Sequence, residues 1–277
     1  RSSDLMGVDM QVLSSNVFWY GKDAALAQEI CRINNDNLAK LCAAHPTRFS
    51  AFASIALQHP ELAVQQLEAV MKIPGFRGAA IQANVQGMEF SNPKFDPVWA
   101  KAEALGAVLF IHPQSTPELA KRFKGNGWLS NTIGNPLDTT VAVSHLIFDG
   151  VLARNPKLRI ILAHGGSYLA HYWARMDHVY GARADGRTVI KRKPSYYLEK
   201  FYFDTITFDP GMLRNMIDRF GADHVMLGTD YPYDMAEVDP LGLVSAVKRL
   251  NKGDRDLITG GNAAKLFKVK LPRKKKV

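Results

Sequence analysis

The feature that most constrains the fold of this chain is a repeated alternation of short apolar runs with longer helical segments. Seven runs predicted as strands occupy residues 10–15, 49–55, 78–82, 107–113, 159–165, 201–205 and 225–230. Predicted helices follow them at residues 23–45, 60–72, 97–105, 139–153, 168–180, 210–220 and 240–250. The runs show little polar alternation, which is typical of parallel strands covered on both faces. The pattern therefore predicts a parallel α/β fold.

The number of strands selects between two parallel architectures. A closed (β/α)8 barrel needs eight strand–helix units, whereas a doubly wound open sheet can stop at seven. No GxGxxG motif follows an early strand, and the chain begins at Arg1 rather than Met. We therefore predict a (β/α)8 TIM barrel of the metal-dependent hydrolase type, with its first strand missing here and expected upstream of residue 1. No linker divides the 277 residues, so we expect one domain over residues 1–267 and a basic tail over 268–277.

Composition limits the classes of function. Hydrophobic residues make up 47% and charged residues 22%, as in ordinary globular proteins. The tail supplies most of the net charge of +9. A terminal Lys run can signal nuclear import or nucleic-acid binding, but we interpret it as a solvated tail and expect no nucleic-acid partner. No run resembles a membrane span or a signal peptide, and Cys31 and Cys42 lack CxxC spacing. We therefore expect a cytoplasmic protein without membrane contact.

Three predicted strands end in residues that can bind a metal: His112, His164 and Asp230. The carboxyl ends of barrel strands surround one mouth, so these side chains should converge there. Imidazole and carboxylate suit zinc, or manganese where more oxygen ligands join. A lone histidine at a strand end is more often structural, but three such residues at one end favour a site. Asp204 also ends a strand, either as a partner of this group or as a structural residue.

The motifs LFIHP, ILAHGG, LGTDYPY and GNAAKLF occur in an order and spacing that resemble the amidohydrolase-2 family, whose best-known member is aminocarboxymuconate-semialdehyde decarboxylase. The resemblance also includes GVDMQVLS and covers nearly the whole chain. It implies that His112 and Asp230 are metal ligands and that His164 is the catalytic base and proton relay. Asp230 would also move protons, and the metal would be a divalent ion, zinc or manganese. The HxH pair that the family carries on its first strand has no match here.

The resemblance also implies a set of substrate-binding residues. Arg183 matches an arginine that reaches the site of a neighbouring subunit, where its planar fork would hold a substrate carboxylate. This implies a homodimer; the alternative is a solvated loop arginine. Asn131 stands where the aminocarboxymuconate enzyme has a tryptophan, and Trp128 lies nearby. Tyr233 stands where phenylalanine is usual, so we expect a pocket with altered substrate preference.

Three functions remain open on the sequence. The leading one is a metal-dependent, non-oxidative decarboxylase (carboxy-lyase) acting on an unsaturated or aromatic carboxylic acid. The second is a metal-dependent hydrolase or hydratase that uses the same site on a lactone, an ester or an enol acid. The third is a non-catalytic barrel that binds an acidic partner through its basic tail.

Overall fold

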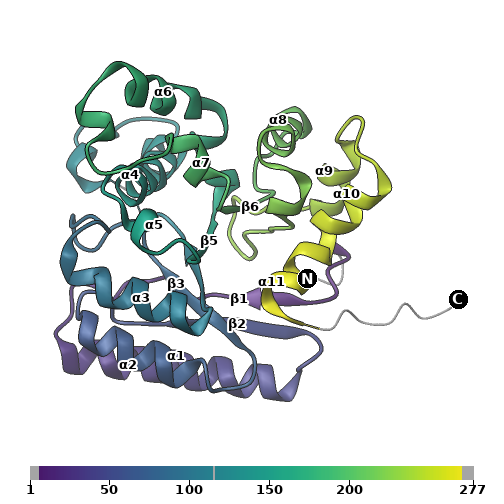
Figure 1. Cartoon of the computed structure of the whole chain (residues 1–277). Coiled ribbons are helices and arrows are strands. Elements are labelled where there is room, and N and C mark those ends of the chain that lie inside the picture. Colours follow the sequence, from purple (N-terminus) through teal and green to yellow (C-terminus); the bar gives the residue numbers. More distant parts are fainter. Residues whose placement is uncertain (1–5, 115, 270–277) are drawn as a thin grey trace, which may run out of the picture.

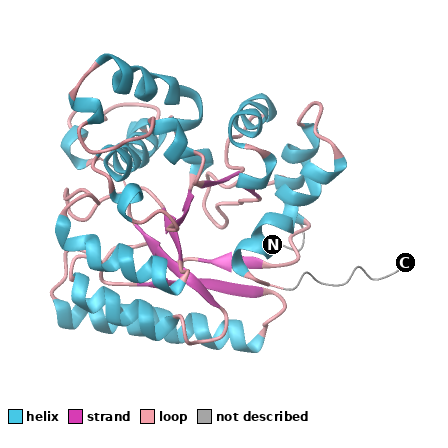
Figure 2. Ribbon diagram, viewed as in Figure 1, coloured by secondary structure: helices cyan, strands magenta, loops and turns pink. Residues whose placement is uncertain are grey.

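The structure is a computed structural model that describes residues 6–114 and 116–269. Seven parallel strands form one sheet in the order β1 to β7, so each strand lies beside its neighbour in the sequence (Figures 1 and 2). This confirms the predicted parallel α/β fold with seven strands. The strands are β1 (Gln11–Leu13), β2 (Phe49–Ser54), β3 (Phe76–Ile81), β4 (Val108–Ile111), β5 (Arg159–Leu162), β6 (Tyr202–Asp204) and β7 (Val225–Met226).

The strand order decides between the two architectures. A doubly wound sheet reverses its strand order at a switch point, and this sheet does not. Within the described ranges, β1 pairs only with β2 and β7 only with β6. The sheet therefore belongs to the barrel type but is an open, curled half barrel of seven strands, which is consistent with the predicted (β/α)8 fold lacking its first strand.

Helices cover the outside of the sheet, with α1 and α2 along one flank and α8 to α10 gathered beyond β6 (Figure 1). The bounds are α1 (Ala24–Ala44), α2 (Pro60–Val70), α3 (Asp96–Leu105), α4 (Asn135–Phe148), α5 (Val151–Arg154), α6 (Leu169–Ala182), α7 (Pro194–Leu198), α8 (Pro210–Phe220), α9 (Pro240–Ala246), α10 (Lys252–Asp256) and α11 (Asn262–Phe267). None of these described helices has the length and apolar character needed to cross a bilayer.

Two element boundaries differ from the predictions for physical reasons. The helix predicted over 139–153 is divided into α4 and α5, because Gly150 between them adopts a left-handed φ of 79°. The strand predicted over 225–230 pairs only at Val225 and Met226. It has one neighbour rather than two, so its second half leaves the sheet as a loop.

The sheet has two buried faces, which strand alternation separates cleanly. One face of the sheet packs against the helices, and we call it the outer face. It carries the odd positions of β2 and β4, such as Ala51, Ala53 and Leu109, which belong to the main core. The intervening residues point inward and form a second cluster. Its members from the strands are Phe52, Ala80, Val108, Ile161 and Met226.

The C-terminal helix α11 covers this inner face. Leu266 and Phe267 belong to the inner cluster, and the Phe267 ring meets Phe52 edge-on at 5.7 Å between centroids. Figure 1 shows α11 lying close to β1 at the open edge of the sheet. The predicted basic tail falls largely at residues 270–277, which lie outside the described residues.

Candidate metal and active site

The segments that follow β4 and β7 bring His112 and Asp230 to the inner face. His112 follows Val108 and Phe110 at alternate positions, and those two side chains point inward. Its backbone N–H donates to the Ile81 carbonyl at 3.0 Å, which continues the hydrogen bonds between β3 and β4 by one residue. Asp230 lies four residues after inward-facing Met226, in the loop that follows β7, and has a left-handed φ of 54°. The segments after two separate strands thus direct these side chains into the space that the curled sheet encloses.

His164 reaches the same space by a turn rather than by alternation. Ile161 of β5 points inward and Leu162 points outward, so an extended chain would direct His164 outward. Instead, His164, Gly165 and Gly166 adopt φ values of 56°, 59° and 69°. This left-handed turn redirects the imidazole to the inner side. The Gly165-Gly166 pair in the sequence indicated such a turn but not its direction.

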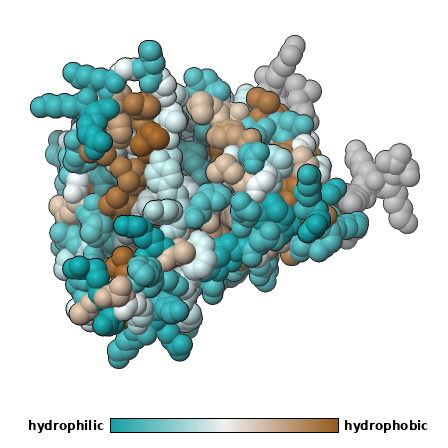
Figure 3. All heavy atoms as spheres, turned by 90° about the horizontal axis from the view of Figure 1, so that it is seen from above, coloured by the Kyte–Doolittle hydropathy of each residue, from teal (hydrophilic) through white to brown (hydrophobic). Residues whose placement is uncertain are grey.

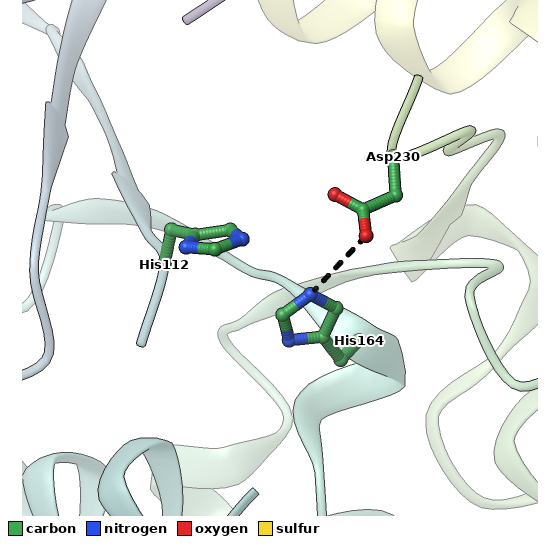
Figure 4. A group of neighbouring side chains, drawn as sticks. All are labelled: His112, His164 and Asp230. Atoms are coloured by element: carbon green, nitrogen blue, oxygen red, sulfur yellow. Dashed lines mark ion pairs between the residues drawn. The ribbon is translucent and has the colours of Figure 1, made fainter. Parts of the chain in front are cut away.

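The three side chains converge (Figure 4). Each of His112, His164 and Asp230 offers one ligand atom, and these atoms all lie within 4.8 Å of one another. The two imidazole rings meet edge-on at 4.9 Å, and His164 Nε2 lies 4.0 Å from Asp230 Oδ2. The side chains of His164 and Asp230 are 20% and 19% exposed, so ligands can reach them from the cavity. The structure therefore brings together the three residues predicted to form the site.

Burial sets the protonation states of the group. It lowers the pKa of His112 to about 4, assisted by His164, and it lowers the pKa of His164 to about 4. Burial also raises the pKa of Asp230 to about 6, reinforced by the carboxylates of Asp204 and Asp234. The imidazoles are thus neutral near pH 7, which is the form that binds metals. A bound dication would lower the pKa of the carboxyl group by direct attraction.

This donor set fits a divalent metal. Two neutral imidazole nitrogens and a carboxylate oxygen are ligands that zinc accepts and that manganese also uses. Three protein ligands leave positions open, as in catalytic rather than structural metal sites. Across the described ranges, this is the only group of three or more His, Cys, Asp or Glu residues found close enough to hold an ion.

The three side chains line a cavity of about 390 Å³, which lies within the size range of small-molecule sites. Its wall comes from both edges of the sheet and from α11. Sequence reasoning missed several of these wall residues, among them Ser14, Asn16, Phe52, Phe110, Thr259 and Phe267. Ser14 and Asn16 follow a strand end, which was an available signal. The contribution of α11 had no local signal in the sequence.

The predicted substrate-binding residues have different positions. Tyr233 lines the cavity, and its hydroxyl accepts a hydrogen bond from Asn16 across the open edge of the sheet. Trp128 is 55% exposed, and its carbonyl accepts from the Asn131 N–H at 2.8 Å. Arg183 ends α6 and forms an exposed ion pair with Asp185 at 2.9 Å. Among the described residues, Trp128, Asn131 and Arg183 are not part of the cavity wall.

Known proteins resemble this chain over nearly its whole length. It is 32% identical to 2-amino-3-carboxymuconate-6-semialdehyde decarboxylase of Dictyostelium discoideum, over 92% of this chain and 72% of the relative. The crystal structure of 5-carboxyvanillate decarboxylase from Sphingomonas paucimobilis superposes with a TM-score of 0.89 at 29% identity, covering 97% of this chain and 81% of that one. A dihydroxybenzoic acid decarboxylase from Polaromonas, with bound manganese and the inhibitor 2-nitroresorcinol, gives 0.88 at 30% identity, covering 96% and 83%.

The family assignment rests on a match that spans both the sheet and the site. The amidohydrolase family model (Amidohydro_2) matches residues 10–269. This range includes all seven strands, the three converging side chains and α11. The chain belongs to the amidohydrolase family.

Proposed function

We propose that this protein is a metal-dependent, non-oxidative decarboxylase of an aromatic or unsaturated carboxylic acid. The observation that carries the proposal is the convergence of His112, His164 and Asp230 on one wall of a 390 Å³ cavity. The names of the similar proteins support it, because they are decarboxylases of 5-carboxyvanillate, dihydroxybenzoic acid and a carboxymuconate semialdehyde.

The residues divide into two roles in this proposal. His112 and Asp230 hold the metal, which when bound would polarise substrate oxygens and withdraw electron density from the reacting carbon. His164 moves the proton. Its neutral imidazole lies 4.0 Å from Asp230, so a small rotation brings the two groups within hydrogen-bond reach. The reaction is balanced when the carbon that loses CO2 keeps the bonding electrons and gains one proton.

The choice of metal is part of the proposal. The sequence led us to expect zinc first and manganese second. The bound manganese in the Polaromonas decarboxylase favours manganese as the first ion to test. Purified protein should be stripped with a chelator and reloaded with either ion, and activity should return with one of them.

The test of the function is the product. Protein loaded with manganese is incubated with hydroxybenzoates and with lactones, and CO2 release is measured beside ring opening. We expect CO2 from an aromatic acid, with turnover lost in His164→Ala. His145→Ala is the matched control, because His145 pairs with Asp149 at 2.7 Å in α4 and does not contact the cavity. Unchanged turnover in His164→Ala would contradict the proton-transfer role, and ring opening without CO2 would indicate the hydrolase alternative.

We also propose a homodimer in which Arg183 serves the site of the other subunit. The support is that the Arg183 side chain is 67% exposed at the end of α6 and is not among the residues that line the cavity of its own chain. Tyr172 of the same helix is 64% exposed, and Figure 3 shows apolar side chains gathered on the side of the molecule that carries α4 and α6. A mixture of Arg183→Ala and His164→Ala subunits should regain activity. A monomeric, active protein would contradict the arrangement.

The cytoplasmic location also remains a proposal. It is supported by the two cysteines, which are free and buried. Burial raises the pKa of Cys31 to about 12, which keeps it in the unreactive thiol form. Recovery of the protein from a secreted or membrane fraction of cells would contradict this location.

A further inference from the structure

The turn that carries His164 is conformationally costly. A non-glycine residue in the left-handed region is disfavoured, and such residues persist only where their surroundings hold them. Here His164, with φ 56°, is followed by two left-handed glycines and by Ser167 at φ 63°. Without this turn, strand alternation would direct the imidazole away from the cavity. Some group must therefore hold the turn in place.

The group that holds it is the carboxylate of Asp204 at the end of β6. His164 N–H donates to Asp204 Oδ2 at 3.0 Å, and Gly165 N–H donates to Oδ1 at 2.7 Å. The Ile206 N–H donates to Oδ1 as well, at 3.0 Å. Hydrogen bonds to an ionised acceptor are stronger than neutral ones. From the neighbouring strand, Asp204 thus accepts hydrogen bonds from two successive backbone amides of the turn.

Most acceptor positions of the same carboxylate are already occupied by hydrogen bonds. A carboxylate has about four acceptor positions, and three N–H donors occupy most of them. Asp204 is also absent from the group of ligand atoms formed by His112, His164 and Asp230. Its contacts with His164 are made through the backbone, so it holds that residue by the main chain of the turn.

The end of β6 also contacts the segment that leads to Asp230. Gly228 N–H donates to Thr205 Oγ1 at 3.1 Å, and a Cβ on Gly228 would lie 2.8 Å from Asp204 Cβ. The chain therefore passes Asp204 closely on its way from β7 to Asp230. One strand end sits between the turn that carries His164 and the loop that carries Asp230.

We propose that Asp204 is a positioning residue that sets the distance between His164 and Asp230 by fixing the left-handed turn after β5. This inference rests on the proposed function for the step that His164 performs. Its geometric part concerns the protein alone and can be measured without substrate or metal.

The test is Asp204→Asn, which keeps the size but replaces one oxygen with an NH2 group. That group would face an N–H, because donors approach both oxygens. Hydrogen exchange followed by mass spectrometry should show protection of residues 163–167 falling by roughly 10-fold or more. With manganese bound, kcat should fall by about 100-fold, the scale of a small misplacement, while KM changes by less than about 3-fold.

Asp209→Ala is the control for stability. Asp209 caps α8 by accepting from Met212 N–H at 2.8 Å, so the substitution removes a carboxylate–amide bond outside the cavity. We expect Asp209→Ala to lower the melting temperature and to leave kcat and the exchange of residues 163–167 unchanged. If both variants lose kcat in proportion to stability, Asp204 is only structural and the proposal is overturned.

A second variant keeps the test decisive if Asp204→Asn fails to fold. Gly165→Ala leaves the carboxylate intact but places a Cβ 2.7 Å from Thr207 Cγ2 at φ 59°, which displaces the turn from the other side. It should give the same increase in exchange and the same loss of kcat. Unchanged exchange and kcat in either folded variant overturn the proposal. If the wild type releases no CO2 from any acid, the proposed function fails, and the exchange data alone decide whether Asp204 holds the turn.

Discussion

Gly166 offers a sharp test of how tightly the turn beside the site is packed. Its φ is 69°, and an added Cβ would lie 2.5 and 2.6 Å from two carbons of the Phe203 ring. That ring is fully buried and packs on Phe220 at 4.4 Å between centroids, so it cannot withdraw. Gly166→Ala therefore combines a left-handed alanine, which costs about 1–2 kcal/mol, with overpacking that costs about 1–3 kcal/mol.

The less flexible unfolded chain offsets about 0.4–1 kcal/mol of this cost, so we expect a net loss of about 1–4.6 kcal/mol of unfolding free energy. Gly125→Ala is the control, because Gly125 has φ 116° and no atom within 4 Å of the added Cβ. Urea unfolding of both variants, followed by circular dichroism, measures the difference. A Gly166→Ala protein within about 0.5 kcal/mol of the Gly125→Ala protein would refute the packing argument.

Three further outcomes follow from the site and the inner face. Manganese binding just below pH 6 should release a proton from Asp230, whose pKa burial raises to about 6, whereas the imidazoles, with pKa about 4, are already neutral there. Affinity should therefore rise with pH up to about 6 and then level off, as calorimetry in two buffers would show; a continued steep rise above pH 7 would contradict this. Phe267→Ala should cost about 3–5 kcal/mol in urea unfolding, and a loss below 1 kcal/mol would mean that α11 does not support the inner face. Tyr233→Phe removes the bond to Asn16 and should raise KM by less than about 10-fold with kcat retained; a large loss of kcat would instead give Tyr233 a chemical role.

The sequence was sufficient for the sheet because each strand pairs with its neighbour along the chain. Apolar runs at regular spacing predicted all seven strands, and the sequential parallel order needs no long-range information. His112 was also predictable, since the alternation of β4 determines where it points. Asp230 was predicted from its place shortly after a strand, although it lies in a loop. The predicted strand length was wrong at the open edge of the sheet, where β7 pairs over only two residues.

The remaining parts of the site depend on contacts that sequence patterns do not encode. The inward direction of His164 depends on a carboxylate from another strand, Asp204. The wall supplied by α11 comes from a helix whose Phe267 packs on Phe52 of β2 within the inner cluster. Whether Arg183 completes a site depends on a second copy of the chain, which a single sequence cannot describe in space.

The position of α11 has a consequence for how the chain is made. Strands β1 to β7 can pair one after another as they leave the ribosome, because every partner has already been synthesised. The inner face around Phe52 gains no cover from α11 until Leu266 and Phe267 emerge. At about 5–20 residues per second, that delay is on the order of 10–40 s. A nascent chain of this protein therefore leaves the apolar residues of this concave surface exposed to water until α11 has been synthesised.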